Sequence, residues 1–74
     1  MSNKLSSITP KKALKKLKKA GFIEHHQRDS HLVLKHNDGR MVILPMHSKD
    51  IPKGTLYSII IHQAKLTLRK WKIL

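Results

Sequence analysis

Apolar residues recur at helical spacing in the first part of the chain. One stripe holds Ala13, Leu14, Leu17 and Ala20, and lysines fill most of the positions between them. This pattern predicts a helix that begins at Pro10 behind a Thr9 cap, because a threonine hydroxyl accepts an unpaired backbone N–H and proline loses nothing at the first helical position. The helix is expected to end at Gly21, which tolerates the left-handed conformation that closes a helix. Residues 1–8 are polar and are expected to be frayed.

Three shorter segments alternate in the manner of strands. They are Phe22–Arg28, His31–His36 and Arg40 to about Met46. Arg28-Asp29-Ser30 is expected to form the turn between the first two strands, and Asn37-Asp38-Gly39 is a hairpin signal between the second and the third. Pro45 cannot donate to a ladder, so the third strand fits the edge of the sheet.

Two loop lengths fit the second hairpin, and they give different registers. A two-residue loop sets Leu34 opposite Ile43, whereas a three-residue loop with a left-handed Gly39 pairs His36 with Arg40. We favour the three-residue loop because it makes one face uniformly apolar. That face holds Leu32, Leu34, Val42 and Leu44, and the opposite face holds His31, Val33, Lys35, Met41 and Ile43.

Helical spacing returns near the end of the chain. The apolar positions of that spacing include Leu56, Ile59, Ile60 and Ala64. They predict a second helix from about Lys53 to Ala64, opened by Pro52 or capped by Thr55. Residues 66–74 fit either a short helix capped by Thr67 or a strand.

The order of these elements predicts an α+β fold of one domain over residues 1–74, with a tail or short helix at 67–74. A three-stranded antiparallel sheet carries both helices on one face, and its other face stays open.

The net charge of the chain limits the classes of molecule that it is expected to bind. The 74 residues carry 16 Lys and Arg against 4 Asp and Glu, a net charge of +12, which attracts nucleic acid, an anionic membrane or an acidic protein. There is no cysteine, no apolar run of spanning length and no signal-peptide pattern, so a cytoplasmic protein is expected.

Several kinds of active site find no support in the sequence. Glycine patterns of nucleotide-binding loops are missing, and four acidic residues are too few for a carboxylate-bound two-metal site. The six histidines lack the spacing of metal ligands, and the adjacent His25 and His26 are expected to point to opposite faces of a strand. We therefore expect neither a metal nor a cofactor.

His31 is the candidate for chemistry. It opens the second strand beside Ser30 and projects onto the open face, where Lys35 also lies. An imidazole titrates near neutral pH, so it is suited to remove a proton from a ribose hydroxyl or to return one to a leaving oxygen. Ser30 and Lys35 are candidates for binding RNA beside His31, Lys35 as a phosphate ligand, and Lys11, Lys12, Lys15 and Lys16 are candidates for holding an RNA backbone. A solvated histidine at a strand end is the alternative interpretation.

An ordered set of residues resembles the HicA family of toxins from toxin–antitoxin pairs. The set comprises Gly21-Phe22, Ser30-His31, His36-Asn37-Asp38-Gly39-Arg40, Val42, Leu44-Pro45, His47, Gly54-Thr55-Leu56, Ser58-Ile59 and Gln63-Ala64, and the likeness spans about residues 9 to 66. The resemblance implies a fold similar to the double-stranded-RNA-binding domain, an endoribonuclease that cleaves mRNA and stops translation, and a HicB-type antitoxin. It also implies that His31 is catalytic.

Two positions depart from the family pattern. Asp29 stands where the family's glycine-serine-histidine motif has glycine, and Lys65 stands where glycine usually follows Gln63-Ala64. The first departure keeps open a non-catalytic RNA-binding module of the same fold. Membrane binding by the first helix is disfavoured because its apolar stripe has no aromatic residue. The charge predicts an acidic antitoxin that covers the open face.

Overall fold

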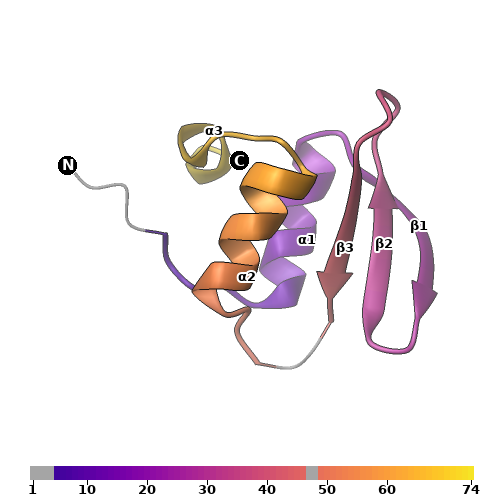
Figure 1. Ribbon diagram of the computed structural model, residues 1–74, viewed down its shortest axis with the longest axis horizontal. Helices are drawn as coiled ribbons and strands as arrows, with labels where there is room; N and C mark the ends of the chain where they lie inside the picture. The colour runs from indigo at the N-terminus through magenta and orange to yellow at the C-terminus, as the bar shows by residue number, and fades with distance from the viewer. Residues whose placement is uncertain (1–4, 47–48) are drawn as a thin grey trace.

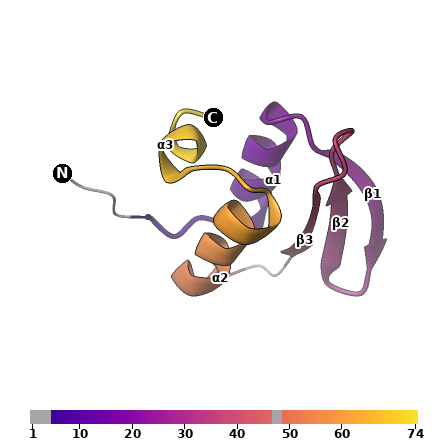
Figure 2. The same ribbon diagram turned by 45° about the horizontal axis from the view of Figure 1, so that its top comes forward.

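A computed structural model describes residues 5–46 and 49–74. Its elements in chain order are α1 (Pro10–Lys19), β1 (Ile23–Arg28), β2 (His31–Lys35), β3 (Met41–Pro45), α2 (Lys53–Ser58), the π-helix η1 (Ile59–Gln63) and α3 (Leu68–Lys72). The strands form one antiparallel sheet in the order β1-β2-β3 (Figure 1). The helices gather on one side of the sheet and leave the other side uncovered (Figure 2). The predicted α+β fold, similar to the double-stranded-RNA-binding domain, is confirmed.

Helix α1 begins and ends where the sequence predicts. The Thr9 hydroxyl accepts the backbone N–H of Lys12 at 3.3 Å, and Pro10 is the first helical residue. Gly21 follows the helix with φ +101°, and a Cβ at this position would lie 2.7 Å from Nε2 of His36. Glycine is therefore required twice at this turn, once for its backbone conformation and once for the close approach of the His36 ring.

The β2–β3 hairpin has the three-residue loop that we favoured. Backbone groups of His36 and Arg40 are bonded at 2.9 Å, and Gly39 has φ +100°. Leu34 consequently pairs with Val42. The predicted apolar face, Leu32, Leu34, Val42 and Leu44, is buried beneath the helices, where the core also takes in Ala13, Leu17, Leu56, Ile59, Ile60 and Trp71.

The β1–β2 hairpin differs from expectation. Arg28 pairs with His31, so the turn has two residues, Asp29 and Ser30, and Asp29 takes φ +55°. Between this turn and the pair of Ile23 with Lys35, β1 has one residue more than β2, and the extra residue forms a β-bulge at His25. The bulge breaks the alternation of side chains, so the expectation that His25 and His26 point to opposite faces is wrong.

The second helix runs as predicted but changes its hydrogen bonding halfway. Pro52 stands at the N-cap of α2, and Thr55 lies within the helix. The chain then continues as η1, where the N–H of Ala64 reaches back five residues to the carbonyl of Ile59 at 2.8 Å. Lys65 ends this segment with φ +55°.

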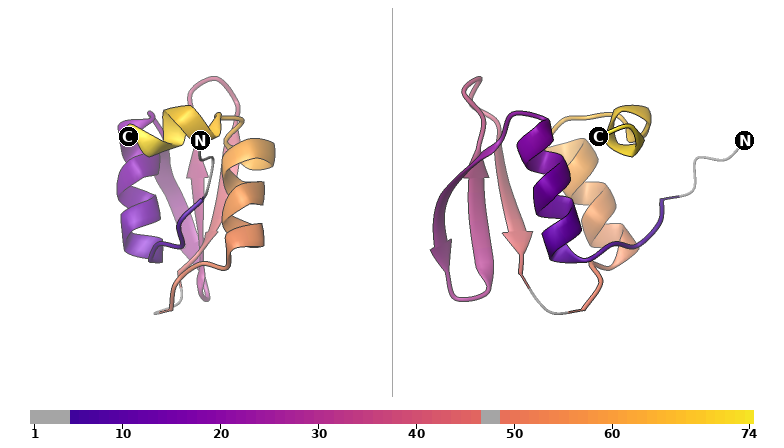
Figure 3. Two further views of the ribbon diagram at one scale, coloured as in Figure 1. Left: turned by 90° about the vertical axis from the view of Figure 1, so that its left-hand side faces the viewer. Right: turned by 180° about the vertical axis from the view of Figure 1, so that it is seen from behind.

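The ambiguous tail is a short helix. The Thr67 hydroxyl accepts the N–H of Lys70 at 3.0 Å and caps α3, so the strand alternative is wrong. Helix α3 lies across one end of α1 and α2 (Figure 3), and it buries Trp71 in the core. Lys16 fastens it, because its Nζ donates to the carbonyl oxygen of Trp71 at 3.0 Å.

The free edge of β3 is partly closed by η1. The backbone N–H of Ile43, which points away from β2, donates to Oε1 of Gln63 at 2.8 Å. Pro45, one pleat further along, has no N–H to present, as expected for an edge strand.

Candidate active site

His31 is exposed on the open face of the sheet, at the start of β2. Its pairing partners are Arg28 on β1 and Pro45 on β3, so the three side chains form one row across the face. The hairpin register, which buries Leu32 under the helices, fixes this orientation. The predicted placement of His31 on the open face is confirmed.

Two shallow hollows meet at His31. The first, of about 390 Å³, is lined by His26, Arg28, Asp29, His31, Val33 and Ile43. The second, of about 400 Å³, is lined by His31, Ile43, Pro45, Pro52, Thr55 and Gln63. His31 is therefore reachable from both sides, and the first hollow adds polar and charged groups beside it.

Arg28 is the cation that sequence reasoning missed. Its guanidinium carries five donors in a fixed fork suited to phosphate, and it lines the first hollow with His31. The signal was present in the sequence, because a two-residue Asp29-Ser30 loop sets Arg28 directly opposite His31. The predicted turn, Arg28-Asp29-Ser30, shares Arg28 with the predicted strand Phe22–Arg28, and a turn that includes Arg28 does not pair it with His31.

Lys35 shares the open face but lies farther from His31. Lys35 comes four positions after His31 on β2, which is roughly 13 Å along a strand. Lys35 thus lies in the row of Ile23 and Met41, at the opposite end of the face. Ser30 precedes His31 in the turn, and its carbonyl accepts the N–H of Met46 at 2.6 Å, which anchors the turn to the end of β3.

The lysines of α1 are not brought together with His31. Helix α1 packs on the covered face of the sheet, so the exposed Lys11, Lys12 and Lys15 belong to the opposite side of the molecule. Lys16 is half-buried, and its ammonium lies 5.2 Å from the centre of the Trp71 ring. Its contacts give Lys16 a structural role in docking α3.

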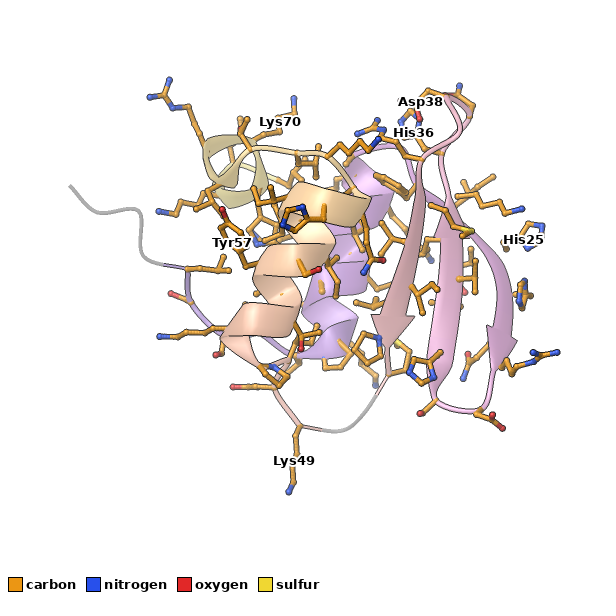
Figure 4. All side chains as sticks on the ribbon, viewed as in Figure 1. His25, His36, Asp38, Lys49, Tyr57 and Lys70 are labelled. Atoms are coloured by element: carbon orange, nitrogen blue, oxygen red, sulfur yellow. The ribbon has the colours of Figure 1, made fainter. Side chains whose placement is uncertain are left out.

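The bulge in β1 brings two imidazoles into contact. Nδ1 of His25 lies 2.8 Å from Nδ1 of His26, and the ring centres are 5.0 Å apart. His25 is on the outer side of β1 (Figure 4), whereas His26 lines the first hollow. Glu24, before the bulge, turns to the helix side and pairs with Lys18 of α1.

A second polar cluster, around Asp38 and Arg40, has a structural role. Both residues belong to the set that resembles the HicA family. Nε of Arg40 donates to the Asp38 carboxylate at 2.8 Å, and its Nη1 donates to the carbonyl oxygen of Ala64 at 2.6 Å. The Arg40 guanidinium also lies 5.1 Å from the centre of the Phe22 ring. These contacts tie the β2–β3 hairpin to the end of η1, at the tip where Figure 4 labels His36 and Asp38.

The same contacts set the charge of Asp38. Hydrogen bonds from the Arg40 side chain and backbone hold the pKa of the Asp38 carboxyl below its usual value. Nδ1 of His36 lies 3.1 Å from this carboxylate, and the His36 ring packs edge-on against Phe22. His36 is thus held in the hairpin and is remote from the row of His31.

Two searches of the described part of the chain concern metal ligands and membrane-spanning helices. Within residues 5–46 and 49–74, no three histidine or acidic side chains are grouped as metal ligands. Over the same residues, no helix is both long and apolar enough to cross a bilayer. His47, which contributes to the family resemblance, lies outside the described residues.

Comparison with known proteins identifies one family. The family model described as "HicA toxin of bacterial toxin-antitoxin" matches residues 10–66, well over half of the chain. A search of curated proteins finds no match. The matched segment begins at the first residue of α1 and ends just after Lys65, so it contains the whole sheet and excludes α3.

Proposed function

The chain belongs to the HicA toxin family of bacterial toxin–antitoxin systems, and from this premise we propose that it is a metal-independent endoribonuclease that cleaves mRNA in the cytoplasm. The observation that carries the proposal is the exposed His31 beside Arg28 in one hollow of the open face. RNA cleavage by transesterification needs at least a base and a phosphate-binding cation in one accessible place.

In the proposed reaction, His31 removes the proton of a ribose 2′-hydroxyl. The 2′-oxygen attacks the neighbouring phosphorus, and the bond from phosphorus to the 5′-oxygen breaks. The products are a 2′,3′-cyclic phosphate and a strand with a 5′-hydroxyl, and the 5′-oxygen takes up one proton. Arg28 binds the phosphate oxygens, where negative charge grows in the transition state. Lys35 binds the RNA backbone further along the same face.

The lysines on α1 serve a different part of the RNA. Because they lie on the covered side of the sheet, Lys11, Lys12 and Lys15 hold backbone that wraps around the domain, independently of sequence. Lys16 contributes less to this grip because its ammonium is already bonded to Trp71.

The antitoxin is expected to be acidic and of the HicB type. On the open face, Met41 and Ile43 are 47% and 44% exposed to solvent. The domain that carries this face has a net charge of +12. A partner that covers these side chains with its own apolar residues, and surrounds them with carboxylates, buries the patch and blocks His31. A complex that leaves His31 open to solvent would contradict this mode of inhibition.

The test compares His31→Ala with a matched histidine variant. His62→Ala is the control, because His62 is exposed on η1, beside Tyr57, and lines neither hollow. We expect the wild type and His62→Ala to arrest growth on induction and to cut RNA in vitro, and His31→Ala to do neither. Cutting by His31→Ala overturns the role of His31, and loss of wild-type cutting in chelator overturns the metal-independent mechanism.

One observation favours a second candidate, a non-catalytic RNA-binding module. The Asp29 carboxylate lines the hollow that the phosphate must enter, and it repels that phosphate. RNA binding by the wild type without any cleavage product, even at high protein concentration, would support this module over the enzyme.

A further inference from the structure

His26 is the second imidazole of the first hollow, and no part of the reaction described so far uses it. The ladder that starts at the Asp29-Ser30 turn places it there, because Arg28 pairs with His31 and His26, two residues before Arg28, pairs with Val33 and shares the same face. Glu24 pairs with Leu34 and faces the helices, whereas His26 pairs with Val33 and faces outward. The bulge at His25 lies between the two residues, so Glu24 faces the helices although it is only two residues before His26.

The register sets the separation of His26 and His31. His26 is opposite Val33, and His31 is two residues from Val33 along β2, so the two histidines are diagonal neighbours on one face. Diagonal neighbours lie about 7–8 Å apart, within reach of aromatic side chains. Both side chains line one hollow, and Arg28 and Asp29 line it too. One phosphate held by Arg28 can therefore have an imidazole on each side.

His25 orients the ring of His26. The distance of 2.8 Å between their Nδ1 atoms requires one ring to donate and the other to accept. When Nδ1–H of His26 donates to His25, the Nε2 atom of His26 is left to exchange a proton with the substrate. This arrangement resembles other catalytic histidines, whose second nitrogen is held by a neighbouring group.

We propose that His26 is a second catalytic residue, the general acid that protonates the leaving 5′-oxygen, with His31 as the base and His25 as a positioning residue. The proposal rests on the endoribonuclease function. The proton removed from the 2′-hydroxyl goes to His31, and the proton on the 5′-oxygen comes from Nε2 of His26. Both histidines then exchange protons with water, so the protein returns to its starting state.

The experiment uses two RNA substrates that differ in the leaving atom. Cleavage sites are mapped with the wild-type protein, and one site is then synthesised with sulfur in place of the bridging 5′-oxygen. A thiolate leaves without protonation, so the sulfur substrate does not need a general acid. The variants are His26→Ala, His31→Ala, His25→Ala and the control His62→Ala, each checked for its thermal unfolding transition.

On the oxygen substrate, we expect His26→Ala to lose about 10²–10⁴-fold in kcat/KM, the usual contribution of a proton-transfer group. We expect it to recover to within a few-fold of the wild type on the sulfur substrate, whereas His31→Ala stays inactive on both. His25→Ala shows a smaller loss that sulfur also restores. In the pH profile of the wild type, kcat/KM falls at both ends, and His26→Ala loses the alkaline fall.

The outcomes separate this proposal from the function on which it rests. A wild type that gives no cleavage site in the mapping step overturns the endoribonuclease function and the role of His26 together. A wild type that cuts, with His26→Ala equally fast or equally impaired on both substrates, overturns only the role of His26. Rescue of His31→Ala instead of His26→Ala by sulfur overturns the assignment of His26 as the acid.

Discussion

Replacing Lys65 with glycine is expected to stabilise the fold. Lys65 follows η1 with φ +55°, a region in which the Cβ of an ordinary residue crowds the backbone. Its side chain is exposed, and the next N–H, from Leu66, closes the helix end onto the carbonyl of Ile60 at 2.8 Å. This hydrogen bond holds Lys65 in the left-handed conformation, so the folded state keeps the free-energy cost of that conformation.

The size of the effect follows from two opposing quantities. A left-handed residue other than glycine costs about 1–2 kcal/mol relative to an ordinary conformation. Glycine avoids this cost but gives the unfolded chain more freedom, which removes about 0.4–1 kcal/mol of the gain. At the midpoints of these two ranges the net stabilisation is about 0.8 kcal/mol, or about 3–6 °C in the unfolding temperature of a domain of this size.

The assay is thermal and urea unfolding of three proteins, the wild type, Lys65→Gly and Lys65→Ala. The alanine variant removes the long side chain but keeps a Cβ at φ +55°, so we expect it to unfold within about 0.3 kcal/mol of the wild type. Equal stabilisation by alanine and glycine would refute the backbone argument and point to the lysine side chain instead.

Three further predictions address the site and the hairpin. Asp29→Asn removes a negative charge on the order of 7 Å from the bound phosphate, worth about 0.6 kcal/mol in water, so we expect roughly threefold faster cleavage at low substrate concentration; unchanged kcat/KM would contradict the placement of the phosphate. Gly21→Ala is expected to destabilise by about 1–3 kcal/mol, because it meets both φ +101° and the His36 ring, and a melting curve like that of the wild type would disprove the double requirement. The pKa of Asp38 is lowered by Arg40 in the folded state, so the stability that this carboxylate contributes is present above pH 4 and is lost as the pH falls through its folded value; Asp38→Asn should remove that acid-side loss in urea unfolding measured from pH 2 to 7.

The hairpin of β2 and β3 was predictable because its turn chemistry and its apolar face agree. Gly39 allows the left-handed bulge, and only the three-residue loop puts Leu34 and Val42 on one face. The placement of His31 on the open face follows from the same register. Both conclusions depend on residues near one another in the sequence.

The residues beside His31 depend on the length of the β1–β2 turn, and the bulge depends on a count that spans the whole hairpin. The two-residue turn at Asp29 and the pair of Ile23 with Lys35 leave one extra residue in β1, and its position at His25 follows from contacts such as that of Glu24 with Lys18 of α1. Those contacts are tertiary, so alternation alone could not reveal that Glu24 faces the helices, whereas the position of His26 follows from the two-residue turn by simple alternation from Arg28. The change to π-helical bonding in η1 likewise has no local sequence signal.

The protection of the two edge strands affects how the protein behaves at high concentration. A bare edge strand offers its unpaired N–H and C=O groups to other chains, and it is a common route to aggregation. On β3, Gln63 occupies the N–H of Ile43 and Pro45 has none to offer, while on β1 the bulge at His25 interrupts the ladder. These features oppose sheet-to-sheet growth between copies, so the domain can accumulate without polymerising through its strands.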